Sequence, residues 1–304
     1  MPGLYWQRNR PVCEGAHTIF VRIRKPMSRL KISAISYLNT APLLWDFEHE
    51  GPRPDFDISY TLPSGCAEAL RTGTQDVGII PAAAYTTIPD LVVIPDIAIA
   101  ANSAVRSILL VSMTPLEKIR SVALDNSSLT SVALLKVLFA KWWRGERSFN
   151  GMVPDLERML EHHDAALLIG DPALKVDRSR YVTYDLAEEW IRFTGKPFVF
   201  AFWAVRQAAL KDAPLSVDLT TVFQESRDHG LEPDSLDRIA GEWSPRTGLS
   251  ETGIKDYLTG NIHYYLDPDC LEGLNLFYSY ARECDVLPDC PALQFLEIAK
   301  PIVG

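Results

Sequence analysis

No apolar run in the sequence approaches the ~18 residues that a membrane-spanning helix needs. Basic residues are outnumbered as well: 30 lysines and arginines face 39 aspartates and glutamates, which gives a formal net charge of −9. Proteins that bind nucleic acid through its phosphates usually carry a basic surface. We therefore expect neither a membrane nor a nucleic acid as a partner.

Cysteine is rare, and its spacing carries no metal or redox signature. The chain has five cysteines, and no two of them form a C-x-x-C pair. This spacing gives no support to a zinc site or to thioredoxin-like chemistry. The N-terminal segment also lacks the apolar stretch of ~7–15 residues that a signal peptide needs, so we expect reduced thiols and a cytoplasmic protein.

The common catalytic motifs are missing too. The sequence has no Walker loop, no Gly-x-Ser-x-Gly and no Gly-x-Gly-x-x-Gly. Their absence argues against the P-loop nucleotide hydrolases, the α/β-hydrolases and the dinucleotide-binding enzymes.

What is present is an ordinary globular composition, with 47% hydrophobic and 23% charged residues. A length of 304 residues suggests about two domains. The charge is uneven, because residues 1–31 hold seven basic residues and one acidic residue. We expect residues 1–29 to be a basic tail that is either disordered or placed before the true start, for which Met27 is a candidate. A functional arm is the alternative.

Strands and helices alternate over the first part of the chain. Strands are expected at 30–35, 58–62, 76–80, 91–94 and 105–111. One helix is expected to begin near Pro42 with Thr40 as its N-cap, and a second to begin at Ser64. This order is the βαβ pattern of a parallel sheet.

The pattern then restarts. Strands are expected at 121–124, 166–169, 181–184 and 197–206, and helices at 132–143 and 186–193. From 207 to about 284 the sequence is helical and shows no core of its own. We therefore expect this helical tail to pack back on the first segment.

These patterns predict an α/β protein of two lobes. Residues 30–112 plus 206–304 form lobe 1, and residues 113–205 form lobe 2. The chain would cross between the lobes twice, near 112 and near 205, which predicts a hinge and an interlobe cleft. Ligands in such folds bind at the carboxyl ends of strands and at the N-termini of helices.

Polar residues gather where this architecture places the cleft. They are Ser36, Tyr37, Asn39, Arg106, Ser107, Ser127, Ser128, Thr130, Ser131 and Asp171. The four hydroxyl residues among them that begin the helix at 132–143 offer N–H and O–H donors for an anion, although plain N-capping needs only one or two. Asp171 is either a base or ligand contact, or the N-cap of the next turn. None of the six histidines is expected to face the cleft, so the residues indicate a binder of a small anion and name no reaction.

Six segments resemble the MqnA family, the chorismate dehydratases of the futalosine route to menaquinone. They are 36–43 (SYLNTAPL), 94–100 (IPDIAIA), 105–110 (VRSILL), 124–131 (LDNSSLTS), 168–174 (LIGDPAL) and 197–204 (PFVFAFWA). The likeness runs in the same order from about 30 to 300 and leaves out the basic tail. Where many members carry Ser and Glu within 81–85, this chain has Ala82, Ala83 and Ala84.

The resemblance implies a periplasmic-binding-protein type II-like fold and a hydro-lyase that converts chorismate to 3-[(1-carboxyvinyl)oxy]benzoate and water. It implies Asn39 and Ser107 as the catalytic pair. Loss of water makes the substrate ring aromatic, so the chemistry needs no redox cofactor and no metal. The proton acceptor is left open between the substrate's own carboxylate and Asp171.

The substrate of this family is a dicarboxylate, and the remaining polar residues are expected to bind it. We expect Ser127, Ser128, Thr130 and Ser131 to hold one carboxylate. Further substrate-binding residues are expected at Ser36, Tyr37, Thr40, Arg106 and Asp171.

Three alternatives compete with this interpretation. A non-catalytic solute-binding protein for a small anion would share the fold but is normally exported. The later pathway enzyme that makes 1,4-dihydroxy-6-naphthoate has a different opening motif. A ligand-sensing domain of a transcription regulator would need a helix-turn-helix segment, for which residues 1–30 are too short. Monomer and homodimer are both open.

Overall fold

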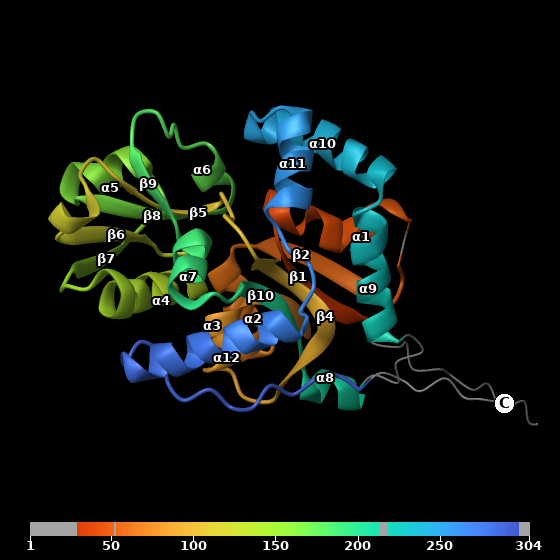
Figure 1. The fold of residues 1–304 in the computed structure, drawn as a ribbon. Coiled ribbons are helices and arrows are strands. Elements are labelled where there is room, and N and C mark those ends of the chain that lie inside the picture. The colour runs from red at the N-terminus through yellow and green to blue at the C-terminus, as the bar shows by residue number, and fades with distance from the viewer. Residues whose placement is uncertain (1–28, 52, 213–217, 298–304) are drawn as a thin grey trace, which may run out of the picture.

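The structure is a computed structural model that describes residues 29–51, 53–212 and 218–297. The expected basic tail therefore lies outside the described residues, apart from Arg29. Two five-stranded sheets form the centres of two lobes (Figure 1), so the expectation of a two-lobed α/β fold is confirmed. Within the described ranges, no helix combines the length and the apolar character that crossing a membrane requires.

Lobe 1 is built on a mixed sheet with the strand order β2-β1-β3-β10-β4. Its strands are β1 (Leu30–Ile35), β2 (Phe56–Thr61), β3 (Val77–Pro81), β4 (Leu91–Ala101) and β10 (Phe198–Arg206). β1 pairs in parallel with β2 and β3, whereas β10 runs antiparallel to β3 and β4. β4 is longer than the expected 91–94 because it bulges at Asp96, where φ is 62°, and then continues.

Helices from two separate parts of the chain cover this sheet. They are η1 (Leu38–Leu44), α1 (Trp45–His49), α2 (Pro63–Thr72), α3 (Ala82–Tyr85), α8 (Gln207–Asp212), α9 (Leu219–Gly230), α10 (Pro233–Thr247), α11 (Glu251–Gly260) and α12 (Pro268–Glu283). The helical tail packs back on lobe 1, as expected. One close contact is at Gly230 of α9, where a Cβ would lie 2.1 Å from the carbonyl oxygen of Pro42.

Lobe 2 has a sheet with the order β7-β6-β8-β5-β9. Its elements are β5 (Ile108–Ser112), η2 (Leu116–Lys118), β6 (Ser121–Asp125), α4 (Thr130–Val137), η3 (Leu138–Trp143), β7 (Ser148–Met152), α5 (Leu156–His162), β8 (Ala165–Ile169), α6 (Gly170–Leu174), β9 (Val182–Asp185) and α7 (Leu186–Thr194). The sequence analysis missed β7, because its SFNGM sequence combines Asn and Gly and is mostly exposed.

The two crossovers between the lobes lie earlier in the chain than expected. β5 belongs to the sheet of lobe 2 and β10 to the sheet of lobe 1, so the chain crosses within 102–107 and within 195–197, and not near 112 and 205. Both strands are buried almost along their whole length. Such strands read as continuous apolar runs, and their sequence does not show which sheet they join.

A carboxylate anchors the first crossover. Asp185, the N-cap of α7, accepts hydrogen bonds from the N–H groups of Val105 (3.1 Å) and Arg106 (2.6 Å). It also accepts from the N–H groups of Ala187 and Glu188 at the start of α7. Arg106 has a φ of 62°, and the two bonds to Asp185 hold its backbone in that conformation.

An aromatic cluster fills the space between the lobes at the second crossover. Trp190 of α7 is fully buried. Its ring centroid lies 5.4 Å from that of Phe198 in β10 and 6.2 Å from that of Phe277 in α12. Its indole N–H donates to the carbonyl of Pro197. The lobes therefore share one hydrophobic core.

Candidate functional site

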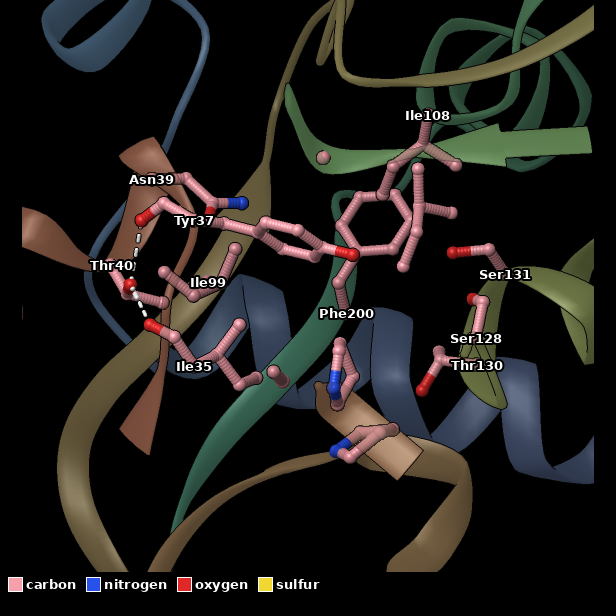
Figure 2. A pocket seen from close by; sticks show the side chains of 15 residues that line it. Ile35, Tyr37, Asn39, Thr40, Ile99, Ile108, Ser128, Thr130, Ser131 and Phe200 are labelled. Atoms are coloured by element: carbon pink, nitrogen blue, oxygen red, sulfur yellow. Dashed lines mark hydrogen bonds between the residues drawn. The ribbon is translucent and has the colours of Figure 1, made fainter. Parts of the chain in front are cut away.

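A pocket lies between the lobes, and both contribute to its walls (Figure 2). It is lined by Ile35, Tyr37, Asn39, Thr40, Pro63, Pro81, Ile99, Phe200 and Ala201 of lobe 1 and by Ile108, Ser128, Thr130, Ser131, Ile169 and Gly170 of lobe 2. Its walls are mostly apolar, which suits the binding of a ring-shaped ligand. None of these described residues is charged, so an anion would be held by neutral hydrogen-bond donors.

Tyr37 crosses the pocket from lobe 1. Its ring packs on Gly170 so closely that a Cβ there would lie 2.8 Å from Cδ2 and Cε2 of the tyrosine. In Figure 2 its hydroxyl is directed toward the side of the pocket that holds Ser128 and Ser131. Burial raises the pKa of Tyr37, and the nearby Ser127 hydroxyl partly opposes this rise. Tyr37 is therefore a neutral hydrogen-bonding group at ordinary pH.

Asn39 reaches the pocket because Thr40 fastens the short helix η1 to the end of β1. The Thr40 hydroxyl lies 2.6 Å from the carbonyl oxygen of Ile35 and 2.7 Å from that of Tyr37. The expectation that Thr40 is an N-cap is wrong, because η1 begins at Leu38 with Tyr37 at its N-cap. The side-chain amide of Asn39 has no hydrogen bond to another described residue, which leaves its donors and acceptor for a ligand.

The four hydroxyl residues before and within α4 differ in what they contact. Ser127 is used internally, since its N–H and hydroxyl both donate to Asp125 Oδ1, at 2.9 and 2.6 Å. Thr130 Oγ1 accepts a hydrogen bond from the N–H of Ala83 in lobe 1. The hydroxyls of Ser128 and Ser131 have no hydrogen bond within the described part of the chain. Of the four, these two have the most donor capacity left for a ligand.

Asp171 joins the lobes and does not line the pocket. Its Oδ1 accepts a hydrogen bond of 3.0 Å from the N–H of Leu38, next to Asn39. Burial raises the pKa of Asp171, while the Leu38 N–H and the positive charges of Lys175 and Arg246 oppose that rise. The N-cap alternative is wrong, because Ile169 is the N-cap of α6.

Ser107, Arg106 and Ser36 lie outside the lining of this pocket. The Ser107 hydroxyl is fully buried and has no hydrogen-bond partner among the described residues. Burial raises the pKa of the enclosed Tyr257, and the Ser107 hydroxyl lowers it in part. The two hydroxyls are therefore neighbours. The Arg106 guanidinium lies 3.4 Å from Asn261 Oδ1. Ser36 is exposed and lines an adjoining groove.

The sequence analysis missed several residues on which this geometry depends. Gly170, with a φ of 62°, gives Tyr37 room, and Asp185 anchors the crossover. The N-cap pattern before α7 was a signal for Asp185 as a cap, but it did not indicate the bonds to Val105 and Arg106. Phe200 of β10 also lines the pocket. The expectation that this strand belongs to lobe 2 is wrong, because β10 is part of the sheet of lobe 1.

One cluster of possible metal ligands lies outside the pocket. Ligand atoms of His263, Asp267 and Cys270 all lie within 4.8 Å of one another. Both oxygens of Asp267 already have partners, since Oδ1 accepts from the Cys270 N–H and Oδ2 lies 2.7 Å from His263 Nε2. The cluster is therefore accounted for by capping of α12 and by the hydrogen bond between Asp267 and His263.

Comparison with known sequences identifies a family. A family model described as "Menaquinone biosynthesis" matches residues 30–283. A curated relative, the chorismate dehydratase of Thermus thermophilus, is 30% identical over 260 residues, which is 79% of this chain and 91% of the relative.

Solved structures show the same fold at low identity. Protein AF1704 from Archaeoglobus fulgidus superimposes with a TM-score of 0.68 at 14% identity, over 85% of this chain and 98% of that chain. The alkanesulfonate-binding protein SsuA from Xanthomonas axonopodis pv. citri, bound to MOPS, gives 0.60 at 15% identity, over 88% and 98%. At such identities these likenesses establish the fold alone, which is of the periplasmic-binding-protein type.

Proposed function

The chain belongs to the MqnA family, the chorismate dehydratases of menaquinone biosynthesis, and from this premise we propose how the interlobe pocket dehydrates chorismate. The enzyme is a hydro-lyase that forms 3-[(1-carboxyvinyl)oxy]benzoate and water. We place the reaction on the futalosine route and in the cytoplasm. Gel filtration at several concentrations distinguishes a monomer from a homodimer.

The reaction breaks two bonds of the substrate ring and forms one π bond. The electron pair of the C3–H bond forms the new π bond of the ring, and the C4–O bond breaks. The proton and the hydroxide together make up the one water that is lost. The product ring is aromatic, so the driving force comes from the substrate. The protein must fix the ring, favour departure of the hydroxyl and provide a place for the proton.

The pocket walls fit these requirements. Tyr37, Phe200 and the aliphatic side chains around them would enclose the ring. The Ser128 and Ser131 hydroxyls at the N-terminus of α4 would bind one carboxylate, since they have no internal partner and the helix dipole favours an anion there. Ser127 and Thr130 would support this end of the pocket through the bonds that they already make.

Asn39 would act on the reacting edge of the ring. Its amide lines the pocket without an internal partner, so it can donate to the leaving hydroxyl or to charge that develops in the transition state. Ser107, at the end of the first crossover and just before β5, would assist. Because its hydroxyl is buried beside Tyr257 and outside the lining, this role requires a new side-chain rotamer when substrate binds.

The observation that carries this proposal is the unpartnered Asn39 amide in a mostly apolar interlobe pocket whose other side-chain donors are hydroxyls. We expect Asn39→Ala to lower kcat for chorismate by roughly 10²–10³, the usual loss for one well-placed donor. Asn275→Ala, on the exposed face of α12, is the matched control and should keep full turnover. Near-normal turnover by Asn39→Ala would refute the assignment.

No described residue that lines the pocket is charged, so the candidate proton acceptors are a carboxylate of the substrate and Asp171, which lies behind the lining and accepts the N–H of Leu38. Asp171→Asn keeps an oxygen that can accept the Leu38 N–H and removes the base. If Asp171 takes the proton, kcat falls by about 10² or more. If the substrate takes it, kcat stays within about tenfold, and single-turnover measurements across pH separate the two cases.

A further inference from the structure

A second groove adjoins the pocket on lobe 1. The two share Ile35 and Thr40, both of which Figure 2 labels at one end of the pocket. Beyond this shared wall the groove is lined by Ser36, Ala41, Leu44, Phe47, Glu48, Tyr60, Trp243 and Arg246. Arg246, near the end of α10, is the single positively charged residue among these described lining residues.

Arg246 is held in place without an ionic partner. Its guanidinium carbon lies 3.8 Å from the centroid of the Trp243 ring, a cation–π contact that fixes the charge and leaves its N–H donors exposed. Within the described part of the chain it forms no ion pair. Glu48, the acidic residue of the groove, already accepts a hydrogen bond from the Tyr60 hydroxyl.

A second cation approaches from lobe 2. Lys175, which follows α6, places its Nζ 3.3 Å from the carbonyl oxygen of Arg246. Both cations act on the carboxyl group of Asp171, whose Oδ1 is occupied by the Leu38 N–H. Figure 1 shows α6 facing α10 and α11 across the gap between the lobes. One positive charge from each lobe therefore lies near Asp171.

The substrate of the proposed function needs such charges before it binds. It is a dianion, whereas the chain has a formal net charge of −9 and no described residue of the pocket lining is charged. Long-range repulsion slows the association of such a pair unless local cations attract the ligand. Ser36, exposed just after β1, lines the same groove and adds a hydroxyl donor.

We propose that this groove is a carboxylate-capture site, in which Arg246, with Lys175 opposite and Ser36 beside it, draws the dianionic substrate to the mouth of the pocket. This inference rests on the proposed function. It assigns the groove a part in association and none in the chemical step. A ligand with two carboxylates is favoured over one with a single carboxylate, because both cations lie at the entrance.

The test compares Arg246→Gln and Lys175→Gln with Arg282→Gln, which removes one exposed positive charge from the far helix α12. At low salt, the first two variants should lower kcat/KM for chorismate about 5- to 20-fold, leave kcat within twofold and weaken the dependence of kcat/KM on ionic strength. Arg282→Gln should change neither. Arg246→Lys keeps the charge and should restore most of kcat/KM.

Association is also measured without turnover, by stopped-flow tryptophan fluorescence with the product 3-[(1-carboxyvinyl)oxy]benzoate as the probe. The same two variants should slow association by a similar factor. If the wild type turns chorismate over but the two Gln variants behave like Arg282→Gln, the capture site is wrong and the proposed function stands. If the wild type neither turns over chorismate nor binds the product, both proposals fall.

Discussion

Gly170 and Tyr37 meet across the cleft, and the closeness of that contact sets the shape of the pocket. The glycine has no Cβ and a φ of 62°, so the tyrosine ring can lie directly on the backbone of lobe 2. Next to it, Asp171 accepts the N–H of Leu38. Gly170 and Asp171 of lobe 2 therefore hold the Tyr37–Asn39 segment in place when the lobes are closed.

Gly170→Ala should damage the site more than the fold. The new Cβ would lie 2.8 Å from two ring atoms of Tyr37, so the ring must move and turnover should fall about tenfold or more. Gly195→Ala is the matched control, because its φ is 70° but nothing lies within 4 Å of its Cβ. Both variants place an L residue at a positive φ and should lose about 1–2 kcal/mol of stability for that reason, with a further loss in Gly170→Ala from the contact with Tyr37; urea unfolding measures both. Equal turnover in the two variants would contradict the account.

His229 gives the fold a pH dependence of known sign. Its hydrogen bond to the buried Asp46, and the charges of Asp46, Glu232 and Glu225, raise the pKa of His229 above its usual 6.5. Because the folded value is the higher one, the stabilisation is complete below the unfolded pKa of about 6.5 and is lost as the pH rises through the folded pKa.

The check is a thermal unfolding series. The difference in Tm between the wild type and His229→Gln should be largest near pH 6 and shrink toward pH 9. We expect it to correspond to less than about 1 kcal/mol, because the side chain is nearly half exposed to solvent. A difference that grows with pH would show that the ion pair does not stabilise the fold.

At the scale of secondary structure, the alternation of strands and helices predicted most of the elements. It also predicted that the helical tail packs on lobe 1. The sheet membership of β5 and β10 could not be predicted, because a strand buried on both faces has no period that points to a partner. The exposed sequence of β7 gave no apolar signal. The spacing predicts that the four hydroxyl residues at α4 act together, but Ser127 is bonded to Asp125 and Thr130 to the N–H of Ala83. These bonds depend on tertiary contacts that the spacing of residues in the sequence does not show.

The crossover at 102–107 should depend on Asp185 more than an ordinary helix cap would. Asp185→Asn leaves one acceptor oxygen, so the N–H of Val105 or of Arg106 would face an amide NH₂ group. We expect a loss of about 1–3 kcal/mol in the free energy of unfolding. Asp218→Asn, at the N-cap of α9, is the control and should lose less than about 1 kcal/mol, since Asn caps helices nearly as well as Asp.

At the scale of the whole molecule, the two lobes are joined both by a shared apolar core and by hydrogen bonds. Trp190 and its aromatic neighbours form the shared core. In addition, the N–H groups of Leu38, Ser64 and Ala83 in lobe 1 donate to Asp171, Ser127 and Thr130 in lobe 2. Opening the cleft would have to break these hydrogen bonds while the shared core keeps the lobes together, which describes a hinge motion.

The most direct test of the account is the reaction itself. The purified chain is mixed with chorismate and a chelator, without nucleotide, and the products are identified by mass spectrometry and proton NMR, with Asn39→Ala prepared in the same way as the control. We predict conversion to 3-[(1-carboxyvinyl)oxy]benzoate, with loss of the C3 proton signal and appearance of aromatic ones, and far slower conversion by the variant. Chorismate that persists in the presence of the wild-type protein, or that is converted at the same rate by both proteins, would contradict it.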